Sequence, residues 1–238
     1  FRMDPDVPLV IPEINAEDIK GHNGIISNPN CATIIGLVPL YPLHKAAGAK
    51  RIIASTYQAA SGAGLPGLTS LKNQMADVVA GRKVTETAPF AYQLAVNLIP
   101  QIGGFDEVGY TSEEMKMQNE GRKIMHLPEL RVNCTCVRVP IMRSHSESIT
   151  VEFERPLSPD EARAILEDAP GIKVVDNPAE LQYPMPLDTS DQDLIYVGRI
   201  REDLSADKNT NALTFFCCGD QIRKGAATNA VQIAEYLL

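Results

Sequence analysis

The chain has 238 residues, of which 44% are hydrophobic and 22% charged, so it can bury a sizeable core and is not expected to be disordered. Its formal net charge of −8 argues against binding nucleic acid, which requires a basic surface. The longest apolar stretch, residues 31–43, is too short and too interrupted to cross a membrane, and five cysteines form no even disulfide framework, so a reducing, cytoplasmic location is expected.

The first half of the chain is predicted to hold one prominent helix. It begins at Cys31, directly after the turn Ser27-Asn28-Pro29-Asn30, and runs towards His44 with kinks at Pro39 and Pro42. Apolar runs, β-branched residues and helical periodicity predict the other elements of this half: strands at 7–14, 24–26 and 51–56, a Gly-rich loop at 61–67 and an amphipathic helix at 68–80.

Two capping boxes mark helices in the second half. Thr111 with Glu114, and Ser158 with Glu161, predict helices that end near residues 125 and 167. The remaining predicted elements are strands at 130–141, 146–154, 172–175, 194–200 and 212–217, and a closing helix at 225–238. Strands clustered in the middle, with helices between and after them, favour an α+β sheet layered by helices.

Cys31 is the first candidate catalytic residue, because it is predicted to lie at a helix N-terminus. The backbone N–H groups and the helix dipole there would lower the pKa of its thiol and stabilise an oxyanion on an attacked carbonyl. The alternative is a small buried hydrophobe, as most free cysteines are. A thiolate nucleophile needs an acid/base partner, and His145, between two predicted strands, is the histidine best placed to point into a cleft.

Other polar residues allow both a functional and a structural interpretation. Arg138 stands on a strand filled with Val and Cys, and it either meets an anion or points to solvent. Glu113 and Lys116 share a helix face, which usually gives a solvated ion pair. The Ser61–Gly64 loop can cradle phosphate, although so short a loop is a weak signal. No metal is expected, since the other cysteines lack zinc-site spacing: Cys134, Cys136, Cys217 and Cys218.

Six motifs, taken in chain order, resemble those of the aspartate-semialdehyde dehydrogenase family. They are Ser27–Thr33, Tyr57–Gly64, Glu113–Lys116, Arg138–Ser146, Val197–Arg201 and Arg223–Ala227. Each motif alone is weak, but together they are specific, because they occur in order and at family-like spacing over essentially the whole chain. The resemblance favours the catalytic interpretation of Cys31.

The resemblance implies a role for each candidate residue. Cys31 attacks the acyl phosphate, or the aldehyde in reverse, and forms a thioacyl enzyme, while His145 acts as general acid/base. Arg138 holds the substrate α-carboxylate in a bidentate pair. Glu113 binds the substrate amino group, and Lys116 binds the phosphate. Asn30 and Gln58 orient the reacting groups. The nicotinamide end of the cofactor NADP(H) is contacted by Ser61, Gly62 and Gln221.

The family's fold is also implied. The sheet is expected to be mixed and largely antiparallel, flanked by helices, like the C-terminal domain of glyceraldehyde-3-phosphate dehydrogenase. Residues 31–219 would form the catalytic and dimerisation domain, whereas 1–30 and the final helix at 220–238 would be remnants of a Rossmann nucleotide-binding domain. The family's N-terminal Gly-rich phosphate loop and an upstream phosphate-binding Arg are absent, so the chain is expected to be part of a longer enzyme and inactive alone.

The implied function is NADP-dependent reductive dephosphorylation of β-aspartyl phosphate to aspartate semialdehyde, with release of phosphate, for lysine, threonine and methionine biosynthesis. A homodimer or tetramer is expected, in the cytoplasm or a plastid, without nucleic-acid or membrane partners. Three alternatives stay open: N-acetyl-glutamyl-phosphate reductase, a non-catalytic dimerisation fragment, and a Cys/His hydrolase. Asn30-Cys31-Ala32 and the Glu113/Lys116 pair match the aspartate enzymes better than the reductase.

Overall fold

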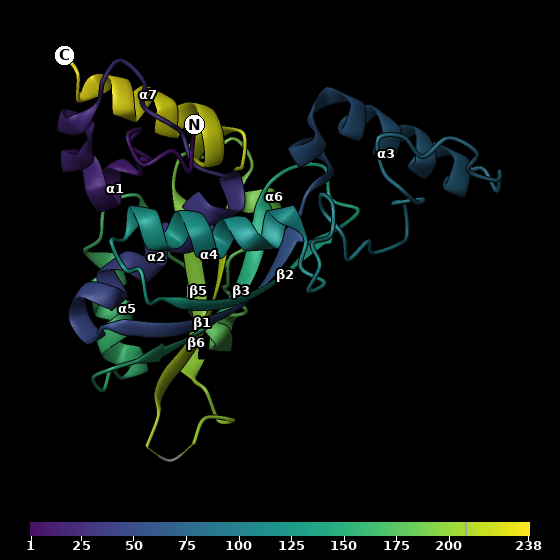
Figure 1. The fold of residues 1–238 in the computed structure, drawn as a ribbon. Coiled ribbons are helices and arrows are strands. Elements are labelled where there is room, and N and C mark those ends of the chain that lie inside the picture. The colour runs from purple at the N-terminus through teal and green to yellow at the C-terminus, as the bar shows by residue number, and fades with distance from the viewer. Residues whose placement is uncertain (208) are drawn as a thin grey trace.

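The computed structural model describes residues 1–207 and 209–238, which form one six-stranded sheet with helices packed on one of its faces (Figure 1). The strand order is β2-β1-β3-β6-β5-β4. The strands are β1 (Ala49–Gln58), β2 (Arg131–Arg138), β3 (His145–Phe153), β4 (Ile172–Val174), β5 (Ile195–Glu202) and β6 (Asn211–Gly219). Two pairs, β1–β2 and β4–β5, are parallel and three are antiparallel, which confirms the mixed, largely antiparallel α+β fold.

The alternation of side chains along the strands decides which face of the sheet is covered. On β1, Ile52, Ala54 and Thr56 are buried, while Ile53 and Tyr57 point the other way and are 38% and 37% exposed. The covering layer consists of α2 (Cys31–Ala47), α4 (Ser112–Ile124) and α5 (Pro159–Glu167). The capping boxes predicted for α4 and α5 are both present, so these two helices begin where the sequence places them.

Helix α2 continues through both of its prolines to Ala47, past the predicted end near His44. Pro39 has no N–H group, so the carbonyl of Ile35 loses its intrahelical donor. The thiol of Cys217 on β6 donates to that carbonyl at 3.7 Å, which partly replaces the missing bond. The helix also approaches the sheet closely at Gly36, where a Cβ would lie 2.6 Å from a carboxylate oxygen of Glu147.

The two ends of the chain pack together on the outer side of α2 and α4 (Figure 1). Val10, Ile19 and Ile233 form a small core there. The buried ammonium of Lys224 donates to a Glu13 carboxylate at 2.6 Å. The elements involved are α1 (Pro12–Asn15), a 3₁₀ turn at Ala16–Gly21, a π-turn at Arg223–Ala227 and α7 (Thr228–Glu235).

Two strands predicted in this region are wrong, whereas the closing helix is present. Residues 7–14 and 24–26 are not strands: one isolated bridge joins Leu9 to Ser27, and Pro12, which cannot donate to a sheet, opens the short helix α1 instead. The predicted closing helix is confirmed, although its first part, Arg223–Ala227, has π geometry and α7 begins at Thr228.

Helix α3 (Gly64–Val79) follows a 3₁₀ turn at Ala60–Ala63 and begins inside the segment predicted as a loop. It and the following segment project away from the sheet (Figure 1) and pack on a core of their own around Leu71, Leu94 and Ile99. Two further short helices, a 3₁₀ turn at Pro178–Glu180 and α6 (Pro186–Thr189), were not predicted. No helix in the described part of the chain combines the length and hydrophobicity needed to cross a membrane.

Candidate active site

Cys31 is the first residue of α2, as predicted, and Asn30 caps that helix. The Asn30 side-chain oxygen accepts from the N–H groups of Ala32 and Thr33 at 3.0 and 3.2 Å. An Asn cap of this kind contributes about 1 kcal/mol to stability. It also occupies two of the donors that the helix end would offer an oxyanion. The expectation that the α2 amides stabilise an oxyanion is therefore wrong for Ala32 and Thr33.

Helix α4 holds Asn30 with two carboxylates that lie two turns apart on one face. A Glu113 oxygen accepts from the Asn30 side-chain amide at 3.0 Å, and a Glu120 oxygen accepts from the Asn30 backbone N–H at 2.7 Å. Sequence reasoning missed Glu120, although its seven-residue spacing from Glu113 was a usable signal. Both carboxylates are buried, so α4 fixes the residue that precedes Cys31.

Glu113 connects several of the predicted site residues. The same oxygen that receives Asn30 accepts from Gln58 Nε2 at 3.0 Å, and the other oxygen accepts from Lys116 Nζ at 2.9 Å. Burial alone would raise the pKa of Glu113, but the Lys116 ammonium and the two amides together lower it below its ordinary value. Glu113 is therefore a buried, charged carboxylate, and the prediction of an ordinary solvated ion pair does not apply.

His145 opens β3 and is completely buried beside Gln58 and Gly62. Its Nδ1 accepts from the backbone N–H of Ala59 at 3.1 Å, so the neutral ring carries its proton on Nε2. Burial, followed by the charge of Arg138, lowers the pKa of His145 to about 3, which keeps the ring neutral.

Two N–H donors consequently converge without an acceptor between them. Gln58 Oε1 accepts from the Thr56 hydroxyl at 2.9 Å, which turns Gln58 Nε2 towards Glu113 and His145. Gln58 Nε2 lies 3.5 Å from His145 Nε2, and both atoms carry hydrogen in this arrangement. The pair forms a site for an electronegative atom of a ligand.

Arg138, at the end of β2, is buried, not a surface residue of the sheet edge. Its Nη1 donates to the carbonyl of Ala59 at 2.6 Å. A Cβ on Gly62 would lie 2.7 Å from that nitrogen and 3.1 Å from the His145 ring, so only glycine fits between the two side chains. Arg138, Gly62 and His145 therefore form one contiguous cluster with the Ala59–Ser61 turn.

The pKa of the Cys31 thiol is not lowered, contrary to the prediction. Burial first, and the charge of Glu113 second, raise it to about 12, and the opposing effects of the Ala32 amide and of Arg138 are smaller. The prediction took account of the helix end but not of what covers it. Gly225, in the C-terminal π-turn, lies so close that a Cβ there would be 3.1 Å from Cys31 Cβ.

The residues predicted to contact the cofactor lie beside this cluster. Ser61 is buried, and its hydroxyl accepts from the side-chain amide of Gln221. The letters Gly62-Ala63-Gly64-Leu65-Pro66-Gly67 match the spacing of dinucleotide-binding glycines. However, α3 projects away from the sheet there (Figure 1). Gly62 instead makes room for the side chains of Arg138 and His145.

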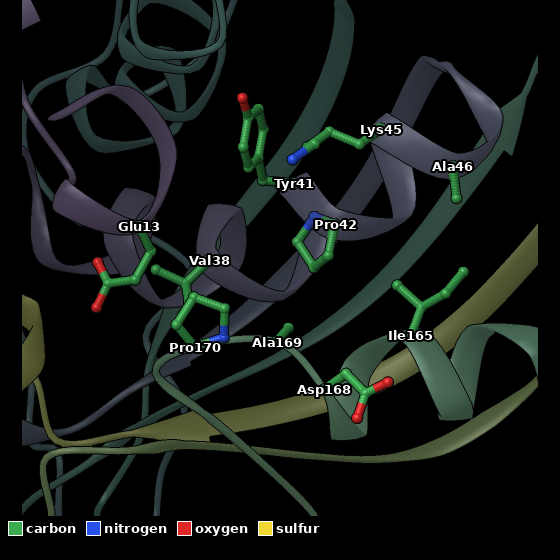
Figure 2. Close-up of a pocket in the computed structure, with 10 residues that line it drawn as sticks. All are labelled: Glu13, Val38, Tyr41, Pro42, Lys45, Ala46, Ile165, Asp168, Ala169 and Pro170. Carbon is green, nitrogen blue, oxygen red and sulfur yellow. The ribbon is translucent and has the colours of Figure 1, made fainter. Parts of the chain in front are cut away.

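A separate cavity of about 490 Å³ lies between α2 and α5 (Figure 2). Glu13, Tyr41, Lys45 and Asp168 provide its polar groups, and its apolar walls include Val38 and Ile165. None of the predicted site residues lines this cavity. The candidate active site is thus distinguished by its polar cluster, and not by the size of a cleft.

Comparisons with known proteins identify the family of the chain. Residues 40–224 match the family model described as "Semialdehyde dehydrogenase, dimerisation domain". The aspartate-semialdehyde dehydrogenase of Aquifex aeolicus is 50% identical over 240 residues, which cover all of this chain and 70% of the relative. The chain therefore spans about 70% of that relative's length.

Two solved structures are similar over nearly the whole chain. One is aspartate semialdehyde dehydrogenase II of Vibrio cholerae complexed with ASA, with a TM-score of 0.94 and 43% identity, covering 100% of this chain and 69% of that one. The other is aspartate semialdehyde dehydrogenase with NADP from Candida albicans, with a TM-score of 0.73 and 27% identity, covering 99% of this chain and 68% of that one.

Proposed function

Because the chain belongs to the aspartate-semialdehyde dehydrogenase family, we propose that it contains the thioacyl-forming site for reductive dephosphorylation of β-aspartyl phosphate to aspartate semialdehyde. Cys31 is the proposed nucleophile. Its thiol gives up its proton as the sulfur bonds to the acyl carbon and forms a tetrahedral intermediate. The C–O bond to phosphate then breaks, and inorganic phosphate leaves with that proton. The observation that carries the proposal is the single polar cluster in which Glu113 bonds to both Asn30 and Gln58 beside Cys31.

The charges of the cluster suit an amino acid that bears a phosphorylated side chain. Glu113 is the anion for the substrate ammonium, and the guanidinium of Arg138 is the partner for the α-carboxylate. Lys116, whose side chain is 38% exposed and bonded to Glu113, is the cation for the phosphate. One carboxylate between two cations matches a ligand with two anionic groups and one ammonium.

Substrate binding itself activates Cys31 in this proposal. The charge of Glu113 raises the pKa of the Cys31 thiol, and a substrate ammonium placed on Glu113 would neutralise that charge. Arg138 acts in the opposite sense and favours the thiolate. The thiol therefore stays protonated until an ammonium ligand arrives, which limits wasteful oxidation or alkylation.

His145 and Gln58 bind the oxyanion in this proposal. Their two Nε2 donors, 3.5 Å apart, converge on one point, and a tetrahedral intermediate on Cys31 would place its oxygen there. This arrangement supports His145 as a hydrogen-bond donor and general acid, which is one part of the acid/base role expected for it. To act as a general base through Nδ1, His145 would have to break the hydrogen bond that Nδ1 accepts from the Ala59 N–H.

NADPH, when bound, supplies the hydride that reduces the thioacyl group, as the NADP-containing relative suggests. Ser61 fits this cofactor, because its hydroxyl hydrogen is still able to donate. Gly62 offers only its backbone, because Arg138 and His145 fill the space where a side chain would lie. Gln221 also fits, because only one of its two Nε2 hydrogens is used on Ser61 while its Oε1 accepts from the Ser144 N–H. We further propose that residues 1–30 and 220–238, which pack on each other, belong with a nucleotide-binding domain.

The proposed partner is a second copy of the chain, bound through the face of the sheet opposite to α2 and α4. The matching family model is described as a dimerisation domain. Ile53 and Tyr57 are partly exposed on this face, and the rings of Tyr57 and Phe216 lie 6.2 Å apart. A partly apolar sheet face of this kind is suited to pairing with a copy of itself.

Acylation of the protein tests the proposed reaction, because it requires neither NADPH nor a nucleotide domain. The chain is mixed with β-aspartyl phosphate, and phosphate release and intact mass are followed. We expect one equivalent of phosphate and one aspartyl adduct on Cys31, with no adduct on Cys31→Ser and a normal adduct on Cys218→Ser.

The same assay separates the rival functions. Acylation by N-acetyl-glutamyl phosphate in preference to β-aspartyl phosphate would indicate the reductase instead. Continuous phosphate release with no stable adduct would indicate a hydrolase. Absence of both would indicate a non-catalytic dimerisation fragment.

A further inference from the structure

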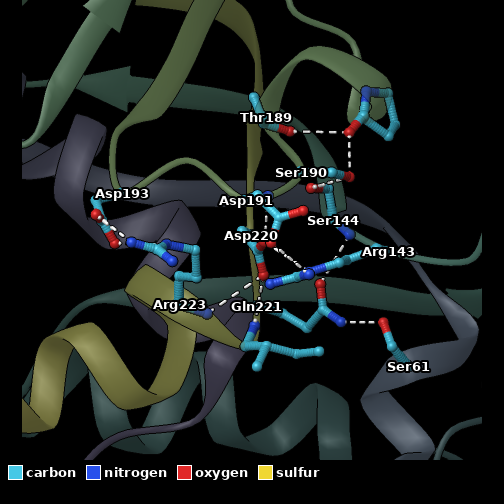
Figure 3. A network of polar contacts seen from close by, with 12 residues as sticks. Ser61, Arg143, Ser144, Thr189, Ser190, Asp191, Asp193, Asp220, Gln221 and Arg223 are labelled. Carbon is cyan, nitrogen blue, oxygen red and sulfur yellow. Dashed lines mark hydrogen bonds and ion pairs between the residues drawn. The ribbon is translucent and has the colours of Figure 1, made fainter.

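A network of polar contacts lies where β6 ends and β3 begins (Figure 3). Because His145 pairs with Gly219 in the antiparallel sheet, the residues just before His145 lie beside those just after Gly219. The first pair is Arg143-Ser144, and the second is Asp220-Gln221. The network therefore acts directly on the segment that leads into the imidazole.

The amide of Gln221 bridges two segments that hold His145. Its Oε1 accepts from the backbone N–H of Ser144 at 2.8 Å, and this bond fixes which end of the amide faces which way. Its Nε2 consequently donates to the hydroxyl of Ser61. Gln221 is buried, so water does not compete freely for either bond.

Each of the two segments sets the position of the imidazole. Ser144 is bonded to His145 and has a φ of +70°, a conformation that non-glycine residues adopt only when neighbours enforce it. On the other side, the turn at residues 59–62 donates the Ala59 N–H to Nδ1 and places Gly62 against the ring. Gln221 thus joins the two sides between which the imidazole is held.

An ion pair anchors the same segment. Arg143 Nε lies 2.8 Å from Asp220 Oδ2, and Arg143 Nη1 lies 2.6 Å from Asp191 Oδ1. The carboxylate of Asp220 is fully buried and also accepts from the backbone N–H groups of Asp191 and Ile222 at 2.7 and 2.9 Å. These contacts hold the Arg143-Ser144 backbone on one side of Gln221.

We propose that Gln221 is a positioning residue that holds the His145 imidazole in its Nε2–H form and orientation, with the Arg143–Asp220 pair as its anchor. The proposal rests on the role proposed for His145, but its physical claim concerns the ring alone. It is compatible with the expected contact between Gln221 and the nicotinamide, because the bond to Ser61 uses only one of the two Nε2 hydrogens.

Nitrogen-15 NMR of the imidazole tests the proposal without catalysis. In the wild-type chain we expect His145 to show one tautomer, with Nε2 protonated from pH 6 to 8. Gln221→Ala and Ser61→Ala each remove the hydrogen bond between these two side chains. In both variants the His145 nitrogen shifts should be averaged over the two tautomers. Gln192→Ala, a change in an exposed neighbour of the same loop, should leave them as in the wild type.

Acylation by β-aspartyl phosphate supplies the second readout. Gln221→Ala should slow phosphate release by about tenfold or more, while Cys31 alkylation by iodoacetamide keeps its wild-type rate. The proposal is overturned if the imidazole nitrogen shifts are unchanged in both Gln221→Ala and Gln221→Asn. It is also overturned if the only effect of these variants is a loss of NADPH affinity. If the shifts respond but no variant or wild type is acylated, the proposed function fails and the positioning role stands.

Discussion

Glu147 on β3 offers the most decisive test of the electrostatics around the site. It is fully buried, and both of its carboxylate oxygens lack a hydrogen-bond partner among the described residues. Burial first, and the nearby Cys136 and Glu113 second, raise its pKa well above 4.5, so the folded protein holds it as a neutral acid. Replacement by Gln keeps the shape of that neutral acid and removes the titration.

The sign of the effect follows from proton linkage. An acid whose pKa is raised by folding contributes stability that is fully present below its unfolded value, near 4.5, and is lost as pH rises towards the folded value. The free energy of unfolding of the wild type should therefore fall relative to Glu147→Gln by about 1.4 kcal/mol per pH unit above 4.5, for as long as the folded carboxyl remains protonated. Below pH 4.5 the free energy of unfolding of Glu147→Gln should not change further relative to that of the wild type.

Urea unfolding at pH 4, 5, 6 and 7 measures this difference. The control is Glu167→Gln, because Glu167 is exposed at the end of α5 and should show no pH-dependent difference from the wild type. If the difference in free energy of unfolding between Glu147→Gln and the wild type stays constant from pH 5 to 7, the reasoning is refuted. It would mean that Glu147 is ionised in the folded protein and has a partner.

Four further outcomes are expected. Cys31 should be alkylated first among the five thiols, because it is partly exposed and the others are buried; peptide mapping that finds Cys218 labelled first would contradict this. Glu113→Gln should raise the rate of Cys31 alkylation at pH 8, since it removes a charge that raises the thiol pKa, and an unchanged rate would argue against that coupling. Arg138→Lys should lower the specificity constant of acylation by about 30-fold, corresponding to about 2 kcal/mol, whereas an unchanged constant would exclude a bidentate contact. Tyr57→Lys should convert a dimer to monomers in sedimentation velocity, while the exposed Val79→Lys on α3 should not.

Local chemistry made much of the fold predictable. The boxes Thr111/Glu114 and Ser158/Glu161 satisfy helix-end amides within three residues, so they specify α4 and α5 without help from distant contacts. The error at residues 7–14 has the opposite origin. An apolar run is compatible with a strand, but a strand needs a neighbour along its length, and only one bridge forms there.

The sequence predicted which residues form the site, but not their hydrogen bonds or pKa values. Motif residues such as Asn30 and Gln58 do lie together, because the ends of β1, β2 and β3 meet at the start of α2. The bonds of Gln221 to Ser61 and Ser144 were not predicted, since they join positions 160 and 77 residues away. The burial of Glu147 was missed although the sequence carried a signal for it, because Glu147 lies in register with Ile149 and Val151 on the buried face of β3.

The raised pKa of Cys31 and the charge of Glu113 are two aspects of one arrangement. A nucleophile at a helix end is activated by the bare backbone amides there, but Asn30 occupies the amides of Ala32 and Thr33. The Ala32 amide and the charge of Arg138 still favour the thiolate, but burial and the charge of Glu113 oppose it more strongly. An ammonium ligand on Glu113 removes part of that opposition, whereas a ligand without an amino group does not. Reactivity of Cys31 should therefore depend on the amino group of the substrate, which supplies specificity at the chemical step as well as at binding.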